Sequence, residues 1–572
     1  MADNFKDVGK GDEDRAKEIV IASIQRFEDM VVERQPLNGQ CEEIAALIQP
    51  SHVGSFNAHG MTTPYTKKTE QQIDASGMLA ADRFMAICDS MLTPKNHLWH
   101  GLTAGGRHAD QLMKDRATRM WFYNTTRTLF RYRYSPVSNF VSQNQGVWHS
   151  LGSYGNGTLF IDKFYDLNKK IDAFRYINIP FGEIYHEFNH QGVVDGFIRV
   201  MKYKARQAAK VPEFQGNLPA EVLEAAGDPK RANREFTFLH RVCPRDEYKP
   251  WMLDNRNMPY ASYYICVETK TLMREGGYQS LPISATQYIT APGEQYGRSI
   301  AMSVLPSLKT LNAEKRVFLK QGHRAADPVL LLADDGVMNM NLKPGAQNRG
   351  GWSSDGKPLV GVLPSGEIQI SEEMMALEKG LIDDAFLVAL FAIAAEPKSG
   401  TTATEVIERI QEKGILIAPT LGRQENYLAR NIDRELDLLS QMRVLEPMPP
   451  LLREAQGDYT VAWSSPLARA QRAQEAAGFM RTVETASGVA NITGDPSYLD
   501  RLDFDVAIPE IAEINGVPEP WLASDDVVAA KREARRKAAE MQQQIQAAPG
   551  AAALMGAQAK QAAAGVQPGA PA

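Results

Sequence analysis

The segment from His186 to His190 has the residue pattern of a zinc site, His-Glu-x-x-His. In a zinc peptidase the two histidines bind the metal and the glutamate activates a water molecule. That chemistry needs both histidines on one helical turn, but residues 189–192 form a turn pattern between two strand patterns. We therefore predict a hairpin tip with exposed polar residues. A zinc-dependent hydrolase using His186, Glu187 and His190 is kept as an alternative function.

Two glycine-containing segments suggest a phosphate-binding loop and a hydrolase nucleophile. Residues 351–357 have the glycine spacing of such a loop, but Pro358 replaces the hydroxyl residue that would hold magnesium, and no helical pattern follows. Ser299 lacks the buried strand that must precede a nucleophile elbow. We predict an ordinary turn at the first segment and a helix-capping turn at the second. No catalytic, cofactor-binding or metal-binding residue is therefore assigned, and no cofactor is expected.

The composition predicts a soluble protein of several domains. The chain has 572 residues, 44% of them hydrophobic, and a formal net charge of −6. A single core stops growing near roughly 250–300 residues, and no apolar run approaches the ~18 residues of a membrane span. The polar first 15 residues and four widely spaced cysteines predict no secretion signal, no disulfide framework and a reduced cytosol. A cytosolic multidomain interaction scaffold is the second alternative function.

Residues 1–298 predict an α+β module within a chain that is mainly helical. The apolar spacing indicates one helix that ends before Pro36, a short one through Ile48, and three more at about 76–93, 110–133 and 136–155. A period of two then indicates strands, interrupted by a charged helical insertion at 205–233. The predicted strands cover residues 158–164, 174–180, 183–188, 193–200, 236–242 and 262–268.

The middle of the chain predicts two long helices joined by a small β-rich knob. Residues 306–324 form an amphipathic rod of about 28 Å at 1.5 Å per residue. Glycine and proline turns punctuate residues 326–370, and Ser371 is the expected cap of a helix that runs to about Ala394. Residues 396–401 break that helix, and the capping box 402–405 begins the next one.

The C-terminal part predicts a strand, helices and a low-complexity tail. Residues 459–463 have strand character, residues 468–487 are helical, and a further helix begins at Ser524. The tail from 547 to 572 is rich in Ala, Gly, Gln and Pro without periodicity, which predicts disorder.

Several motifs together resemble the head-to-tail connecting (portal) proteins of podovirus-type bacteriophages. The resemblance covers about residues 13–525, with Thr401 standing where that family commonly has methionine. The motifs are Tyr-Gly-Arg-Ser at 296–299, Lys-Pro-Gly at 343–345, Thr-Ala-Thr-Glu-Val at 402–406, Leu-Gly-Arg at 421–423 and Ser-Pro-Leu-Ala-Arg-Ala-Gln at 465–471.

The resemblance implies an α+β portal fold and a division of the chain into the parts of a portal. The parts are the wing (1–298), stem helix 1 (299–325), the clip (326–370), stem helix 2 (371–395), the tunnel loop (396–401), the tunnel helix and wing return (402–460), the crown and C-terminal barrel helix (461–546), and the tail (547–572). It further implies a non-enzymatic dodecameric ring at one capsid vertex, through which DNA is packaged and ejected.

The same resemblance assigns candidate site residues and partners. The tunnel loop comprises Glu396, Pro397, Lys398, Ser399, Gly400 and Thr401, with Lys398 as the candidate contact to passing DNA. Basic stem residues expected near DNA or a neighbouring subunit are Lys309, Lys315, Arg316, Lys320 and Arg324. Clip residues expected to contact the terminase or the adaptor are Asp334, Asp335, Lys343, Arg349, Trp352 and Lys357.

The expected partners follow from the portal role. They are other copies of the chain, double-stranded DNA, the terminase large subunit, tail adaptor and nozzle proteins, major capsid and scaffolding proteins, and internal core or ejection proteins at the crown, with no membrane. The expected location is the portal vertex of the virion, after assembly in the cytoplasm of the host bacterium.

Overall fold

The computed structural model describes most of the chain in two compact units. The described residues are 10–56, 69, 71–166, 171–214, 216–249, 251–252, 254–332, 341, 343, 346–347, 352–353, 355–363, 368–388, 422–455, 457–494, 496–514, 517, 521–523 and 527–541. The first unit draws on Met1–Gly101, Thr125–Pro447 and Val461–Gln474, and the second on Leu102–Asn124, Met448–Thr460 and Glu475–Ala572.

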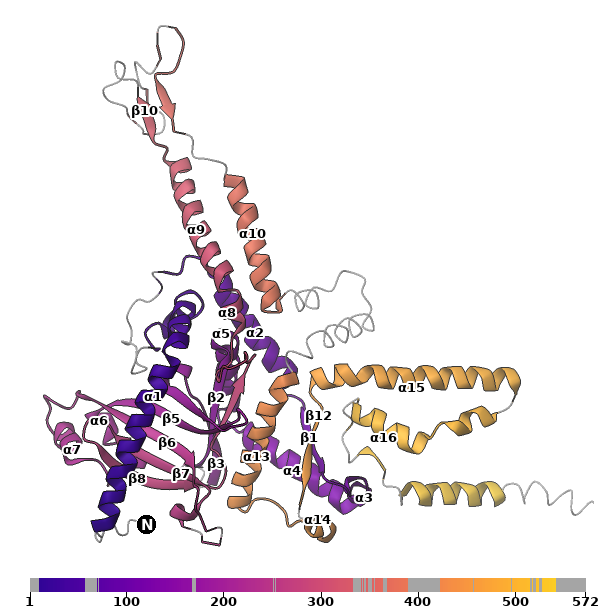
Figure 1. The fold of residues 1–572 in the computed structure, drawn as a ribbon. Coiled ribbons are helices and arrows are strands. Elements are labelled where there is room, and N and C mark those ends of the chain that lie inside the picture. The colour runs from indigo at the N-terminus through magenta and orange to yellow at the C-terminus, as the bar shows by residue number, and fades with distance from the viewer. Residues whose placement is uncertain are drawn as a thin grey trace, which may run out of the picture. The chain divides into compact units, whose positions relative to one another are not determined.

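Two antiparallel sheets form the centre of the first unit (Figure 1). A five-stranded sheet follows the chain in the order β4, β5, β6, β7 and β8, and a three-stranded sheet has the order β3, β2, β9. Strands β8 and β9 were missed by the sequence prediction, while the other six lie where a period of two placed them. The bounds are β2 Asn156–Asp166, β3 Ile171–Asn178, β4 Ile184–Phe188, β5 Val194–Lys204, β6 Glu235–Pro244, β7 Tyr260–Cys266, β8 Thr271–Tyr278 and β9 Ile283–Gln287.

The long helix α1 (Lys10–Ile48) packs on the five-stranded sheet and contains Pro36 in its interior. The predicted break before Pro36 is therefore wrong. A proline inside a helix costs about 3 kcal/mol, but Val20 and Phe27 of α1 are buried against the sheet, and that burial offsets the cost. The buried Arg34 also ties the helix to the sheet, because its guanidinium donates to the carbonyl of Ile184.

Helices α2 (Ser76–Leu92) and α5 (Phe140–Tyr154) pack together, and α5 also covers β2 and β3. The predicted single helix over 110–133 is instead two helices, α3 (Ala109–Lys114) and α4 (Arg116–Arg133). The carboxylate of Asp115 accepts bonds from the backbone N–H and the hydroxyl of Thr118. These bonds cap the start of α4 and separate it from α3.

Gly155 ends α5 in the left-handed conformation, with φ of 74°. A Cβ atom at this position would lie 2.5 Å from the backbone carbon of Arg298. Only glycine therefore allows the chain to turn here while the segment around Arg298 passes so closely. The sequence prediction that this helix stops among its glycines is confirmed.

Helices α9 (Leu305–Ala326) and α10 (Ile368–Ala385) lie side by side (Figure 1). Between them in sequence, β10 (Leu330–Leu332) pairs with β11 (Val360–Val362) in antiparallel register. The predicted first rod is confirmed. The predicted cap Ser371 is wrong, because the second rod already begins at Ile368, and it ends at Ala385 rather than near Ala394. Leu387 then adopts a positive φ of 63°, which does not continue a helix.

The remaining elements of the first unit include α13 (Glu425–Gln441), which packs on the three-stranded sheet. The insertion at 205–233 is helical as predicted. Its elements are α6 (Ala205–Ala208), η3 (Pro212–Phe214) and α7 (Ala220–Gly227). Short elements elsewhere are η1 (Pro50–His52), η2 (Phe181–Glu183), η4 (Asn255–Asn257), α8 (Ile300–Ser303) and η5 (Gly422–Gln424).

The second unit contains mostly helices. They are α3, the first half of α4, α14 (Pro450–Glu454), the larger part of α15 (Pro466–Thr493), η6 (Pro496–Arg501), α16 (Phe504–Ile514) and a helix at 527–541. Phe479 of α15 contacts Phe504 of α16 edge to face, and Arg532 pairs with Asp505. Strand β12 (Tyr459–Trp463) pairs with β1 (His100–Ala104), and its bounds match the predicted strand.

Candidate functional site

The rod of α9 and α10 carries the predicted basic stem residues on α9. Lys309 pairs with Glu43 of α1 at 2.5 Å, and the ammonium of Lys315 lies 5.7 Å from the ring centre of Phe318. Arg316, Lys320 and Arg324 are exposed. These three cations are therefore available on the surface of the rod, whereas Lys309 already has an anionic partner.

The clip is described only in part. Strands β10 and β11 are present, as the prediction of a β-rich knob requires, and Trp352 is 70% exposed. Ser353 donates its N–H to the carbonyl of Lys357, and Gly356 has a φ of 71°. The described residues of this glycine-rich segment therefore form a tight turn, as predicted. Lys343, Trp352 and Lys357 are described, whereas Asp334, Asp335 and Arg349 lie outside the described residues.

The predicted tunnel loop, Glu396 to Thr401, and the predicted capping box at 402–405 lie outside the described residues. The segments on either side are well packed. Phe386 is fully buried and its ring lies 6.3 Å from that of Phe84. After the undescribed stretch, the hydroxyl of Tyr427 donates to Asn144 at 3.0 Å. The described residues on both sides of this stretch, around Phe386 and around Tyr427, thus pack in the core of the first unit.

A buried ion pair fixes α13 to the end of α4. Arg133 and Glu435 have fully buried side chains, and Nε of Arg133 donates to the carboxylate at 3.0 Å. Tyr176 donates its hydroxyl to the same carboxylate at 2.7 Å. A second guanidinium nitrogen of Arg133 lies 2.9 Å from Nε2 of His100. Burial and the neighbouring Arg133 lower the pKa of His100, so the imidazole is neutral and accepts this bond.

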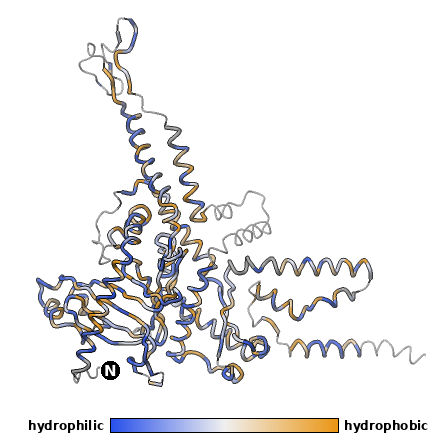
Figure 2. Tube along the Cα trace, viewed as in Figure 1, coloured by the Kyte–Doolittle hydropathy of each residue, from blue (hydrophilic) through white to orange (hydrophobic). Residues whose placement is uncertain are grey.

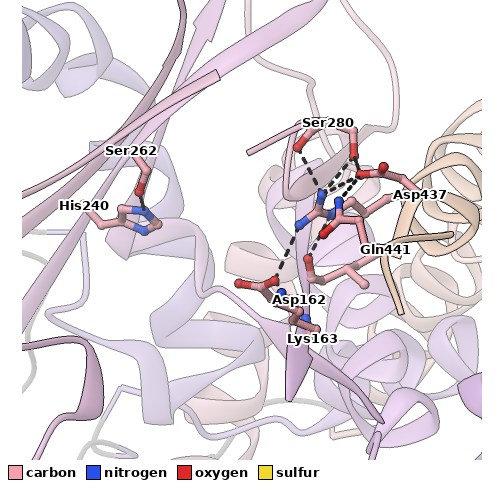
Figure 3. Close-up of polar contacts among 9 residues, drawn as sticks. Asp162, Lys163, His240, Ser262, Ser280, Asp437 and Gln441 are labelled. Atoms are coloured by element: carbon pink, nitrogen blue, oxygen red, sulfur yellow. Dashed lines mark hydrogen bonds and ion pairs between the residues drawn. The ribbon is translucent and has the colours of Figure 1, made fainter. Parts of the chain in front are cut away.

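A second arginine of α13, Arg434, joins this helix to the three-stranded sheet. It donates to the carbonyl of Ile161 at 3.2 Å and to the hydroxyl of Ser280 at 2.9 Å, and it pairs with Asp437 at 3.1 Å. Asp162 lies 3.5 Å away, and burial raises the pKa of its carboxyl against the opposing charge of Arg434. Figure 3 shows the contacts of Asp162, Ser280, Asp437 and Gln441 in this network.

The Arg434 network borders an open cavity of about 420 Å³. Tyr264 lines the cavity, and its ring stacks on the ring of His240 with 4.2 Å between the two ring centres. Nε2 of His240 contacts the hydroxyl of Ser262 at 3.0 Å (Figure 3). The arginine, the carboxylates and the histidine each bond to structural partners, so this arrangement positions strands and helices rather than activating a nucleophile. The sequence prediction missed it, because its members come from five separate segments.

The residues of the His-Glu-x-x-His motif do not converge. His186 lies on β4 and is only 3% exposed, with Nε2 at 2.8 Å from the hydroxyl of Thr158. Glu187 instead pairs with Arg241 at 3.3 Å, and His190 lies exposed in the following turn. The prediction of a hairpin tip is confirmed for His190, but the prediction of exposure is wrong for His186. Neighbouring residues of a strand point to opposite faces, which places His186 in the core.

Burial of His186 and His240 makes the stability of the fold depend on pH. Burial, with smaller contributions from nearby arginines, lowers the pKa of each imidazole to about 3. The unfolded chain takes up these protons near pH 6.5, so between about pH 6.5 and 3 it binds more protons than the folded chain. The stabilisation from each neutral, buried histidine is therefore fully present above about pH 6.5 and declines as the pH falls toward 3. At about pH 5 we expect a loss of about 2 kcal/mol per histidine.

Urea unfolding at about pH 7.5 and 5 measures this effect. Replacing His240 with glutamine should remove its share of the loss at low pH, whatever the substitution costs at neutral pH. The matched control is His190→Gln, which should keep the pH dependence of the parent protein. Equal pH dependence in the parent protein and His240→Gln would contradict the assignment.

Ser299 and the four cysteines have the structural roles that the sequence predicted for them. Ser299 caps α8, because its hydroxyl accepts the N–H of Met302 at 2.9 Å, as expected of a capping turn. All four cysteines are free thiols. Within the described residues, no group of three or more His, Cys, Asp or Glu side chains could hold a metal ion. None of the helices described is both long enough and apolar enough to span a membrane.

Comparison with known proteins decides the family. A family model described as "Bacteriophage head to tail connecting protein" matches residues 22–522. The chain belongs to this family. Its relatives include the "Probable portal protein" of Bordetella phage BPP-1, 25% identical over 537 residues that cover 92% of each chain. The "Portal protein" of Salmonella phage epsilon15 is 26% identical over 430 residues, which cover 73% of this chain and 74% of that protein. The family inferred from the short motifs is confirmed.

Proposed function

We propose that the protein is the portal of a short-tailed bacteriophage, a structural and non-enzymatic ring at one vertex of the capsid. The observation that carries this proposal is the rod of α9 and α10 with the strand pair β10–β11 between them in sequence. A two-stranded sheet is at best marginally stable alone in water. Neighbouring copies in a ring would cover such an element, which supports an assembly over a monomer.

The exposed apolar side chains of the rod and strands support the same proposal. On α10, Leu377 is 70% exposed and Leu381 is 56% exposed, and on α9 Val317 is 52% exposed. Leu331 of β10 and Val362 of β11 are also exposed. Figure 2 shows hydrophobic positions recurring along the two helices between hydrophilic ones. Apolar side chains that recur in this way indicate surfaces that another chain covers.

The parts of a portal are assigned accordingly. The wing comprises residues 1–298, and the two stem helices are α9 (Leu305–Ala326) and α10 (Ile368–Ala385), with the clip between them in sequence. The tunnel loop comprises residues 396–401, the tunnel helix and wing return 402–460, the crown and barrel helix 461–546, and the tail 547–572. In this assignment twelve copies surround a channel for double-stranded DNA. The clip docks the terminase during packaging and the tail adaptor and nozzle afterwards, and the wing and crown meet capsid, scaffolding and internal core proteins.

The mass of the purified protein tests the proposed ring. We expect light scattering to give about twelve times the chain mass, and negative-stain images to show rings with a central hole, because a closed point-group assembly has a defined copy number. Purification in both low and high salt controls for dissociation by screening. A monomer or dimer under every condition would overturn the proposed function.

A further inference from the structure

The two helices of the rod carry opposite charges. Helix α9 has five basic side chains and one acidic one, Glu314. Helix α10 has five acidic side chains and one basic one, Lys379. Two neighbouring antiparallel helices with such charges would normally pair across their contact.

In the described part of the rod, charged side chains of α9 and α10 pair with other helices instead of with each other. Among the described residues, no ion pair joins α9 to α10. Lys309 of α9 pairs with Glu43 of α1, and Asp383 of α10 pairs with Arg83 of α2. Glu314 of α9 and Glu378 of α10 each have one buried carboxylate oxygen without a hydrogen-bond partner. Burial raises the pKa of Glu314, and the negative charge of Glu378 adds to this effect.

The free charges lie on the outer faces of the two helices. Positions 308, 311, 315 and 318 form a less exposed stripe along α9, whereas Arg316, Lys320 and Arg324 are exposed. At 100° per residue, Arg316 and Lys320 fall roughly opposite that stripe. On α10 the less exposed stripe runs through Met375, Glu378 and Ile382, and Glu373 falls roughly opposite it.

The basic and acidic faces lie at the same level of the rod. The strand pair beyond the two helices sets their level, because Leu330 of β10 lies opposite Val362 of β11. Since α9 and α10 run in opposite directions from this pair, position 320 of α9 lies near the level of position 372 of α10. Arg316 and Lys320, one turn apart, therefore bracket the level of Glu372 and Glu373. The exposed Leu377 of α10 and Val317 of α9 lie close to this level on their own helices.

We infer that the outer face of α9 in one copy binds the outer face of α10 in the next copy, with Arg316 and Lys320 facing Glu372 and Glu373. This inference rests on the ring proposed above and names the surface that closes it. The occupant is a second copy because this chain itself supplies the complementary charge at the matching level. The contact is head to tail, so each copy uses both faces, as a closed ring requires. These stem cations then serve the neighbouring subunit rather than DNA.

Charge reversal in the full-length protein tests the inference. The α9 variant is Arg316→Glu with Lys320→Glu, and the α10 variant is Glu372→Lys with Glu373→Lys. Each places like charges on both sides of every interface, so we expect the ring fraction at about 0.15 M salt to fall about tenfold or more, with partial recovery near 1 M salt. A matched control reverses two exposed cations four residues apart on the wing, Arg206→Glu with Lys210→Glu, and should assemble like the parent protein.

Mixing the two reversed variants gives the decisive result. In an alternating ring every α9 face again meets an α10 face of opposite charge, so the mixture should form rings although neither variant does alone. Combining all four substitutions in one chain should also restore rings. Recovery in the combined chain but not in the mixture would place the charges within one copy and overturn the inference. Rings that form normally from the α9 variant would overturn it as well, and lost DNA packaging in those rings would assign the cations to DNA. Absence of rings in the parent protein would instead overturn the proposed function.

Discussion

Replacing Glu435 with alanine is expected to destabilise the first unit by about 3–5 kcal/mol. The substitution leaves the guanidinium of Arg133 fully buried without its anionic partner. Tyr176 also loses the acceptor of its hydroxyl bond. A buried charge that has lost its partner costs far more than the intact pair contributes, because the desolvation of the remaining ion is no longer compensated. The same loss would weaken the attachment of α13 to the sheet.

Urea unfolding followed by tryptophan fluorescence measures this loss. Trp99 is a suitable reporter, because its buried ring lies 4.6 Å from the guanidinium of Arg133. Two controls separate the buried charge from a general effect of the substitution. Arg430→Ala removes an exposed charge on the same helix and should change stability by less than about 0.5 kcal/mol. Arg133→Met combined with Glu435→Leu removes both charges and should recover much of the loss. A change below about 1 kcal/mol for Glu435→Ala would contradict the assigned role.

Local patterns predicted the elements whose signals are contained in a few neighbouring residues. The rod α9, strand β12 and the stop at Gly155 depend on apolar spacing and on one glycine, and each lies where the sequence placed it. The errors arise where tertiary packing outweighs a local signal. Pro36 fails to end α1 because the helix is buried on both sides of the proline: residues before it, such as Phe27, pack on the sheet, and Ile44 and Ile48 after it are fully buried.

The contacts that position the candidate site could not be predicted from spacing. Arg133 and Glu435 are 302 residues apart in sequence, and neither stands in a motif. A charged residue on an amphipathic helix is usually solvated, so the sequence gives no reason to bury either one. The same holds for His186, whose motif suggested a metal and whose strand position instead buries it beside Thr158. Pairings of this kind follow from the arrangement of the sheets, which only the structure supplies.

Deleting residues 396–401 is expected to leave the ring intact and to reduce DNA packaging by about tenfold or more. The flanking segments are anchored independently of these residues, by Phe386 on one side and by Tyr427 on the other. The deleted stretch, Glu-Pro-Lys-Ser-Gly-Thr, contains no large apolar side chain that a core would need. Its one cation, Lys398, is the proposed contact to the passing duplex, since a lone positive charge attracts phosphate without gripping it tightly.

Negative-stain imaging of the purified variant and nuclease protection of DNA in assembled heads measure the two halves of this prediction. A deletion of equal length in the tail, residues 553–558, is the matched control and should keep both rings and packaging. Lys398→Ala should reproduce part of the packaging defect, and Lys398→Arg should retain activity, because the charge rather than the ammonium geometry attracts the backbone. Loss of rings on deletion would show that these residues hold subunits together and would remove them from the channel. Normal rings with normal packaging would contradict the prediction, because other residues of the chain would then make the contact with DNA.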